Sequence, residues 1–152
     1  MAVAGVRGSS AMPGRSAARE ERRAARILVV DDLPYVREAL AELLRGAGYD
    51  VVPLESGPAA LAELERHAAD LVLTDLHMPE MTGWDLARAV RARNVTNARG
   101  LPVCLGLYSA VLSAFTREQL ARAQVDFALT KLSDPDAVVE AIERALAWCE
   151  VR

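Results

Sequence analysis

Apolar residues in this chain fall into two alternating patterns. Short, mostly apolar runs are typical of strands buried on both faces, and they occupy residues 27–30, 51–54, 71–74, 102–107 and 127–130. Between and after these runs, apolar residues recur three or four positions apart, which predicts helices over 57–67, 84–93 and 112–123, from 34 to the glycines at 46 and 48, and from 135 to about 149. Strands alternating with helices predict an α/β fold with a parallel sheet covered on both faces, because parallel strands need crossover connections.

Proline and serine positions refine this outline. Pro34 and Pro135 suit the first turns of their helices, and Ser133 is a candidate cap for the last one. Pro53 cannot donate to a neighbouring strand, so the second strand is expected at a sheet edge. An edge strand in second place fits the doubly wound, five-stranded, flavodoxin-like order 2-1-3-4-5.

Acidic residues follow two strands that are neighbours in this order. Asp31 and Asp32 end the first strand, and Asp75 ends the third. Pro79 keeps the next helix from starting at once, and we expect Gly83 to let the intervening loop turn. Since open α/β sheets bind ligands at the carboxyl ends of their strands, the three carboxylates are predicted to converge on a site.

Three close carboxylates repel one another unless one is protonated or a cation lies between them. Mg²⁺ prefers oxygen ligands, and a carboxylate beside Mg²⁺ can accept a phosphoryl group. The alternative is that Asp31 and Asp75 are ordinary helix caps or loop acids. Lys131 favours the site: it is the one lysine among 18 basic residues and follows the fifth strand, although chance could also place it there.

Length and charge distribution suggest one domain with a basic extension. The chain has 152 residues and a net charge of −3, which suits a single domain. Residues 1–26 carry six Arg and two Glu, a net of +4, so residues 27–152 carry −7. We expect a disordered basic tail over 1–25 and a domain over 26–152, with nucleic-acid binding unlikely because the tail has no interleaved aromatic residues.

Cysteine and hydropathy patterns indicate the cytoplasm. Cys104 and Cys149 lie in apolar surroundings and are expected to be buried free thiols, in agreement with a reducing compartment. No apolar run approaches the length of about 18 residues that spans a bilayer, and the amino-terminal segment does not resemble a signal peptide.

Three segments, 27–32, 71–83 and 127–131, resemble the signature blocks of the response-regulator receiver domain of the chemotaxis-regulator type. The resemblance spans about residues 26–150. It implies a phosphoacceptor at Asp75 and a phosphoryl contact from Lys131. It also implies that Mg²⁺ is the cofactor, held by Asp31, Asp32, Asp75 and the backbone carbonyl of His77. The His77 side chain could tune access of water, or the residue could contribute its carbonyl alone.

The family also uses a Ser or Thr at the end of the fourth strand as a switch hydroxyl. Counting back from Lys131 puts Ser109 there, whereas counting forward from 101–103 puts Leu107 there. We favour Ser109, because a hydroxyl can bond a phosphoryl oxygen and Leu cannot.

Two positions depart from the family pattern. Leu132 replaces the proline that usually follows the lysine, so the Lys131–Leu132 bond is expected to be trans. Ala128 replaces the switch aromatic, and Phe127 and Tyr108 are the nearest aromatic residues. The usual coupling between phosphorylation and that aromatic is therefore in question.

The leading hypothesis is a two-component phospho-receiver rather than an enzyme, with at most slow self-catalysed phosphorylation and dephosphorylation. It would take its phosphoryl group from a histidine kinase or phosphotransfer protein. Because no output domain is expected, it would signal by contact with a further protein through its fourth helix, fifth strand and fifth helix. One alternative is a degenerate receiver that binds proteins without phosphorylation. The other is an aspartyl-nucleophile phosphatase, which is disfavoured because His77 stands where that class has a second acid.

Overall fold

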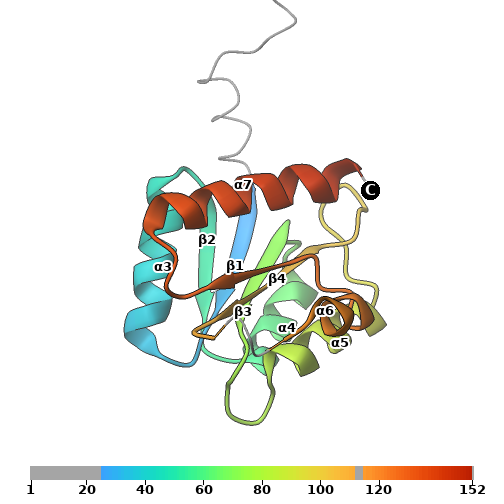
Figure 1. Ribbon diagram of the computed structural model, residues 1–152. Helices are drawn as coiled ribbons and strands as arrows, with labels where there is room; N and C mark the ends of the chain where they lie inside the picture. The colour runs from blue at the N-terminus through green and yellow to red at the C-terminus, as the bar shows by residue number, and fades with distance from the viewer. Residues whose placement is uncertain (1–24, 112–114, 152) are drawn as a thin grey trace, which may run out of the picture.

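The computed structural model describes residues 25–111 and 115–151, and its centre is one parallel sheet (Figure 1). The strands are β1 (Arg26–Val30), β2 (Asp50–Leu54), β3 (Leu71–Asp75), β4 (Cys104–Ser109) and β5 (Phe127–Thr130). Their order is β2-β1-β3-β4-β5, and every neighbouring pair is parallel. The predicted fold class and strand order are confirmed, with the Pro53 strand at an edge.

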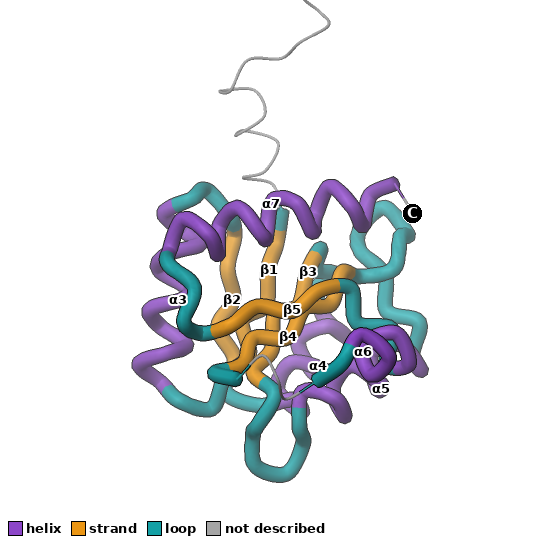
Figure 2. The backbone as a smooth tube through the Cα atoms, viewed as in Figure 1, coloured by secondary structure: helices purple, strands orange, loops and turns teal. Residues whose placement is uncertain are grey.

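Helices cover both faces of the sheet among the described residues. They are α3 (Pro34–Gly46), α4 (Gly57–Arg66), α5 (Gly83–Ala92), α6 (Arg117–Arg122) and α7 (Pro135–Val151). Figures 1 and 2 show α3 and α7 on one face and α4, α5 and α6 on the other. The three-layer arrangement buries both sides of the central strands, which is why those strands are almost entirely apolar.

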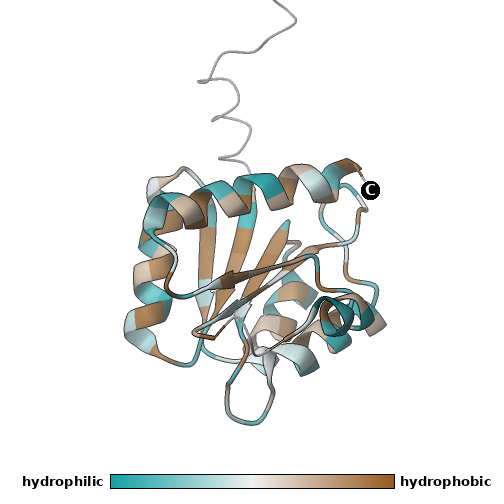
Figure 3. Ribbon diagram, in the orientation of Figure 1, coloured by the Kyte–Doolittle hydropathy of each residue, from teal (hydrophilic) through white to brown (hydrophobic). Residues whose placement is uncertain are grey.

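Alternate residues of each strand belong to different halves of the core. Leu28, Val72 and Leu105 pack under α4 and α5, whereas Ile27 and Leu71 pack under α3 and α7. Figure 3 shows largely hydrophobic strands between helices that mix hydrophobic and hydrophilic residues. The period of two along each strand therefore decides which side chains can reach which helices.

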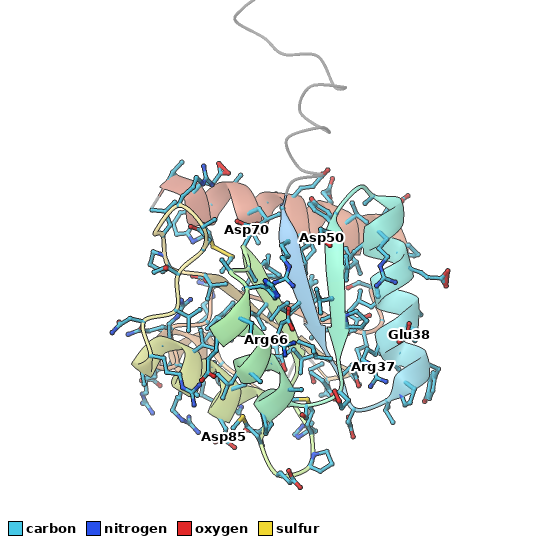
Figure 4. The ribbon with its side chains drawn as sticks, turned by 180° about the vertical axis from the view of Figure 1, so that it is seen from behind. Arg37, Glu38, Asp50, Arg66, Asp70 and Asp85 are labelled. Atoms are coloured by element: carbon cyan, nitrogen blue, oxygen red, sulfur yellow. A yellow bond between two sulfur atoms is a disulfide. The ribbon has the colours of Figure 1, made fainter. Side chains whose placement is uncertain are left out.

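An arginine contacts the acids at the amino end of the sheet. The Arg26 guanidinium contacts Glu63 of α4 at 2.5 Å and Asp50 at 3.7 Å, and its backbone N–H donates to the Asp70 carboxylate at 2.7 Å. Figure 4 shows Asp50 and Asp70 at this end and Asp85, at the start of α5, toward the other. The Arg26 guanidinium thus lies near the acidic side chains at the amino end of the sheet.

The fourth strand begins two residues later than predicted and ends at Ser109. Pro102 makes an isolated antiparallel bridge with Thr96, and the Val103 N–H donates to the Val95 carbonyl. These residues are therefore tied to the preceding loop, and the parallel ladder with β3 begins at Cys104. The apolar run did not reveal this change of partner.

The fourth helix is shorter than predicted. It begins at Arg117, because Thr116 is extended and forms a capping box with Gln119; residues 112–114 lie outside the described residues. The cap of the last helix was also assigned wrongly. Asp134, not Ser133, accepts the hydrogen bond from the Ala137 N–H, at 2.9 Å.

The expectation of two free thiols is wrong. Cys104 and Cys149 form a disulfide that joins β4 to α7, with their Cα atoms 5.9 Å apart. Both residues are buried, as their apolar surroundings suggested. The bond depends on α7 crossing β4, which spacing along the chain does not indicate. The cysteines therefore no longer support a reducing compartment.

The predicted basic tail lies outside the described residues, except for Ala25. Within the described part of the chain, none of the helices is both long enough and apolar enough to cross a bilayer.

Candidate functional site

Three aspartates meet at the carboxyl ends of β1 and β3. The two strands are adjacent, with Val30 aligned to Thr74, so the residues that follow them lie side by side. One carboxylate oxygen from each of Asp31, Asp32 and Asp75 lies within 4.8 Å of the others. Asp31 and Asp75 are buried, and Asp32 is partly exposed. The predicted convergence is confirmed.

Lys131 reaches this cluster from the end of β5. Its Nζ lies 2.9 Å from Asp31 Oδ2 and 3.2 Å from Asp75 Oδ1. Its backbone N–H donates to the Ser109 carbonyl at 2.8 Å, which continues the β4–β5 pairing and directs the chain toward the acids. Burial lowers the pKa of Lys131, but the hydrogen bond to Asp31 and the charges of Asp31 and Asp75 outweigh it and raise that pKa overall.

Asp75 is incompletely neutralised. Burial, followed by the charge of Asp31, raises its pKa, although Lys131 and a hydrogen bond from the Leu76 N–H oppose the rise. Both of these donors bind Oδ1, at 3.2 Å and 2.9 Å. The second oxygen, Oδ2, accepts no hydrogen bond from the described residues. Asp75 thus has one anchored oxygen and one available oxygen.

Gly83 has a different role from the one predicted. It forms the first residue of α5, and its N–H donates to the Leu76 carbonyl at 2.9 Å. A Cβ at this position would lie 2.5 Å from the Asp75 carbonyl oxygen. Gly83 is therefore needed for close approach of two backbones, and the residue in the loop with a left-handed conformation is Glu80, with φ 68°.

The site residues suit a hard divalent cation. Three carboxylates face one ammonium, which leaves an excess of two negative charges. The donors are oxygen atoms, as Mg²⁺ requires. At the other end of the sheet two cations, Arg26 and Arg66, contact the acids.

Ser109 lies at the end of β4, aligned with Thr130, so the count back from Lys131 found the strand end and the count to Leu107 did not. Its buried hydroxyl exchanges hydrogen bonds with the Val111 backbone, at 3.2 and 3.3 Å, and not with Asp75. The His77 side chain is exposed.

Leu132 and Ala128, the two residues that depart from the family pattern, lie just after β5 and within it. None of the described peptide bonds is cis, so Lys131–Leu132 is trans as expected, and the Leu132 side chain is 85% exposed. Ala128 packs with the α4–α5 half of the core, whereas Phe127 and Tyr108 pack on the opposite face of the sheet. Neither Phe127 nor Tyr108 can therefore take the place of the missing ring on the face where Ala128 packs.

Sequence reasoning missed a contact between Tyr108 and Lys131. The Lys131 Nζ lies over the Tyr108 ring, 5.7 Å from its centroid. The register of β4 would have been the signal, because Tyr108 pairs with Asp75 once the strand is shifted by two residues.

The fold and the acid cluster together define a class: a flavodoxin-like α/β domain with an acidic site and a lysine at the carboxyl edge of its sheet. The model of the response regulator receiver domain family matches residues 27–143. The chain belongs to this family, whose members serve two-component signalling systems.

Two groups of relatives are similar to this chain. The sensory transduction protein RegX3 of Mycobacterium bovis is 44% identical over 68 residues, which are 45% of this chain and 30% of that protein. The virulence sensor protein BvgS of Bordetella pertussis is 37% identical over 124 residues, which are 80% of this chain and 10% of that protein. The chain thus spans less than a third of either relative.

Solved structures agree with the family assignment. The chemotaxis response regulator CheY4 of Vibrio cholerae has a TM-score of 0.71 and 25% identity, covering 80% of this chain and 98% of that one. The crystal structure of FixJ-N also has a TM-score of 0.71 and 25% identity, covering 82% of this chain and 94% of that one.

Proposed function

We propose that this protein is a phospho-receiver that accepts a phosphoryl group on Asp75. The observation that carries the proposal is the position of Asp75 between two further carboxylates and the Lys131 ammonium, with one oxygen anchored and one available. A structural role alone would not require three acids to share one lysine in a buried site.

In the proposed reaction, Asp75 Oδ2 attacks the phosphorus of a phosphohistidine on a histidine kinase or phosphotransfer protein. A new P–O bond forms, the P–N bond breaks, and the imidazole nitrogen leaves with the bonding electron pair. Lys131 then pairs with an oxygen of the transferred group, and water later attacks the acyl phosphate to release inorganic phosphate. The protein is a phosphoacceptor rather than an enzyme with separate substrates.

Mg²⁺ is the cofactor of this proposal. Asp31, Asp32, Asp75 and the His77 backbone carbonyl would hold it, and when bound it would neutralise charge on the phosphoryl oxygens. The excess of two negative charges at the site supports a divalent ion.

Ser109 would follow the phosphoryl group and release its hydrogen bonds to the Val111 backbone. The surface that includes α6, β5 and α7 would then contact a downstream protein. The family relationship supports a cytoplasmic location and partners of the histidine-kinase type; binding to membranes or nucleic acid is not part of the proposal.

Incubation with acetyl phosphate and Mg²⁺, followed by intact-mass measurement, tests the proposal. We expect one added phosphoryl group that is absent in Asp75→Asn and without Mg²⁺. Asp50→Asn is the matched control, because Asp50 is exposed at the opposite end of the sheet. No mass gain in the wild-type chain, or an equal gain in Asp75→Asn, would contradict phosphoacceptance at this residue.

The degenerate receiver is the second candidate, favoured by the exposed Leu132 and by Ala128 in the place of an aromatic. A chain that binds Mg²⁺ but never gains mass would support it. The phosphatase alternative predicts turnover of a generic phosphate ester. His77, which is exposed and is not an acid, does not favour it.

A further inference from the structure

We propose that Tyr108 is a positioning residue for Lys131, its ring holding the ammonium group in line with Asp75. This inference rests on the proposed phosphoacceptor function of the same site. The observation behind it is the position of Lys131 Nζ over the Tyr108 ring, 5.7 Å from the ring centroid, within the range of about 6 Å in which cation–π attraction acts.

Strand register puts the ring on the correct face. Tyr108 aligns with Asp75 on one side and with Leu129 on the other, and aligned residues of parallel strands share a face. Lys131 follows Leu129 by two positions. Side chains two positions apart on a strand point to the same face, so the Lys131 side chain lies on the same face as Asp75 and Tyr108. Tyr108 therefore lies in the same row as the phosphoacceptor and next to the lysine.

Burial makes the contact effective. The Lys131 side chain is 17% exposed, and Tyr108 is partly buried with the α3–α7 half of the core. Cation–π attraction strengthens when the cation is withdrawn from water. Burial also raises the pKa of Tyr108, with Lys131 opposing and Asp31 adding to the rise, so the ring is neutral at neutral pH.

The Tyr108 ring can attract the Lys131 ammonium without occupying its hydrogen-bond donors, which the carboxylates cannot do. Lys131 donates to Asp31 and lies 3.2 Å from Asp75, and those contacts must rearrange when a phosphoryl group arrives on Asp75. Attraction to a ring face uses none of the three N–H donors. Tyr108 can therefore hold the ammonium in place while its hydrogen bonds change from carboxylate to phosphoryl oxygen.

The first test measures the rate of phosphoryl uptake from acetyl phosphate with Mg²⁺. We expect Tyr108→Leu to slow uptake by about 3-fold to 30-fold, the range of a partly buried cation–π contact. Tyr108→Phe keeps the ring and should restore the rate to within about twofold of wild type. Phe127→Leu is the matched control, because Phe127 is an aromatic on the same face that packs on Gly106.

Equal rates in wild type and Tyr108→Leu would overturn the inference. So would an equal loss in Tyr108→Phe, which would assign the effect to the hydroxyl. An equal loss in Phe127→Leu would assign it to general packing.

The second test does not depend on phosphorylation. Urea unfolding of wild type, Tyr108→Leu, Lys131→Ala and the double variant forms a double-mutant cycle. We expect Tyr108→Leu to reduce the folding equilibrium constant by about 3-fold to 30-fold more when Lys131 is present. Independent effects would overturn the contact. If wild type takes up no phosphoryl group but the cycle shows coupling, the proposed function fails while the contact between ring and lysine stands.

Discussion

Two buried carboxylates in this protein have pKa values shifted in opposite directions. A hydrogen bond from Arg26, larger in effect than burial, lowers the pKa of Glu63, and Arg66 lowers it further. Burial and the charge of Asp31 raise the pKa of Asp75 despite Lys131. A carboxylate is thus stabilising as an anion at one end of the sheet and costly at the other, where a cation would relieve the repulsion.

Glu63→Gln should be destabilising in a pH-dependent way. The pKa of Glu63 is lower in the folded chain than its ordinary value of 4.5, so its contribution is present above that pH and is lost as pH falls through the folded pKa. At neutral pH the variant should lose about 1.5–3 kcal/mol, as for hydrogen bonds to charged groups. Urea unfolding across this range would measure the difference, which should shrink below pH 4.5.

Glu65→Gln is the control for this prediction, because Glu65 lies on the same helix in an exposed ion pair with Arg93. It should change stability by less than about 1 kcal/mol. A difference between wild type and Glu63→Gln that stays constant with pH would contradict the charge-based explanation.

Gly83→Ala should be destabilising and should also slow phosphoryl uptake. The new Cβ would meet the Asp75 carbonyl oxygen, so the backbone that carries the phosphoacceptor must shift. Overpacking of this kind costs about 1–3 kcal/mol. Gly46→Ala, at the end of α3, meets nothing within 4 Å and should be neutral or slightly stabilising. Thermal unfolding would contradict this prediction if both variants behaved alike.

At the scale of elements, local sequence patterns predict where most strands and helices lie. The exceptions arise where a segment pairs with an unexpected neighbour. The central strands β1 and β3 are predictable because both of their faces are buried, so that apolar runs coincide with them. The start of β4 was not predictable, because Pro102 and Val103 pair with the preceding loop instead of with β3. An apolar run shows that a segment is buried but not which segment it pairs with.

Reduction of the Cys104–Cys149 disulfide should lower the stability of the protein. The bond closes a loop with a sequence separation of 45, for which the chain-entropy estimate is about 4 kcal/mol. Urea unfolding with and without a dithiol reductant would measure the loss. The Cys104→Ala, Cys149→Ala double variant should show no response to the reductant. Two titratable thiols in the unreduced, unfolded chain would contradict the bond.

At the scale of the whole molecule, charge is distributed unevenly along the sheet axis. Arg26 lies among the acids at the amino end, while three aspartates share Lys131 at the carboxyl end. Since the strands are parallel, all their carboxyl ends open onto one edge, and the three aspartates at the ends of β1 and β3 meet there.

Mg²⁺ should stabilise the protein through this edge. At ten times its dissociation constant, an ion that binds only the folded chain adds about 1.4 kcal/mol to the free energy of unfolding. Asp32→Asn should lose most of that gain, because it removes a partly exposed ligand with little effect on the core. Asp50→Asn should keep it. Thermal unfolding with and without Mg²⁺ would contradict the prediction if Asp32→Asn gained as much as wild type.

Alternating apolar runs and helical periods were enough to establish the fold class, the strand order and the convergence of Asp31, Asp32 and Asp75. These features depend on local burial and on the geometry common to parallel sheets, which a linear pattern contains. The disulfide, the register of β4, the approach of Gly83 to Asp75 and the ring under Lys131 were decided only in three dimensions. Each of these joins groups whose contact depends on how neighbouring segments pack, and spacing along the chain does not record that.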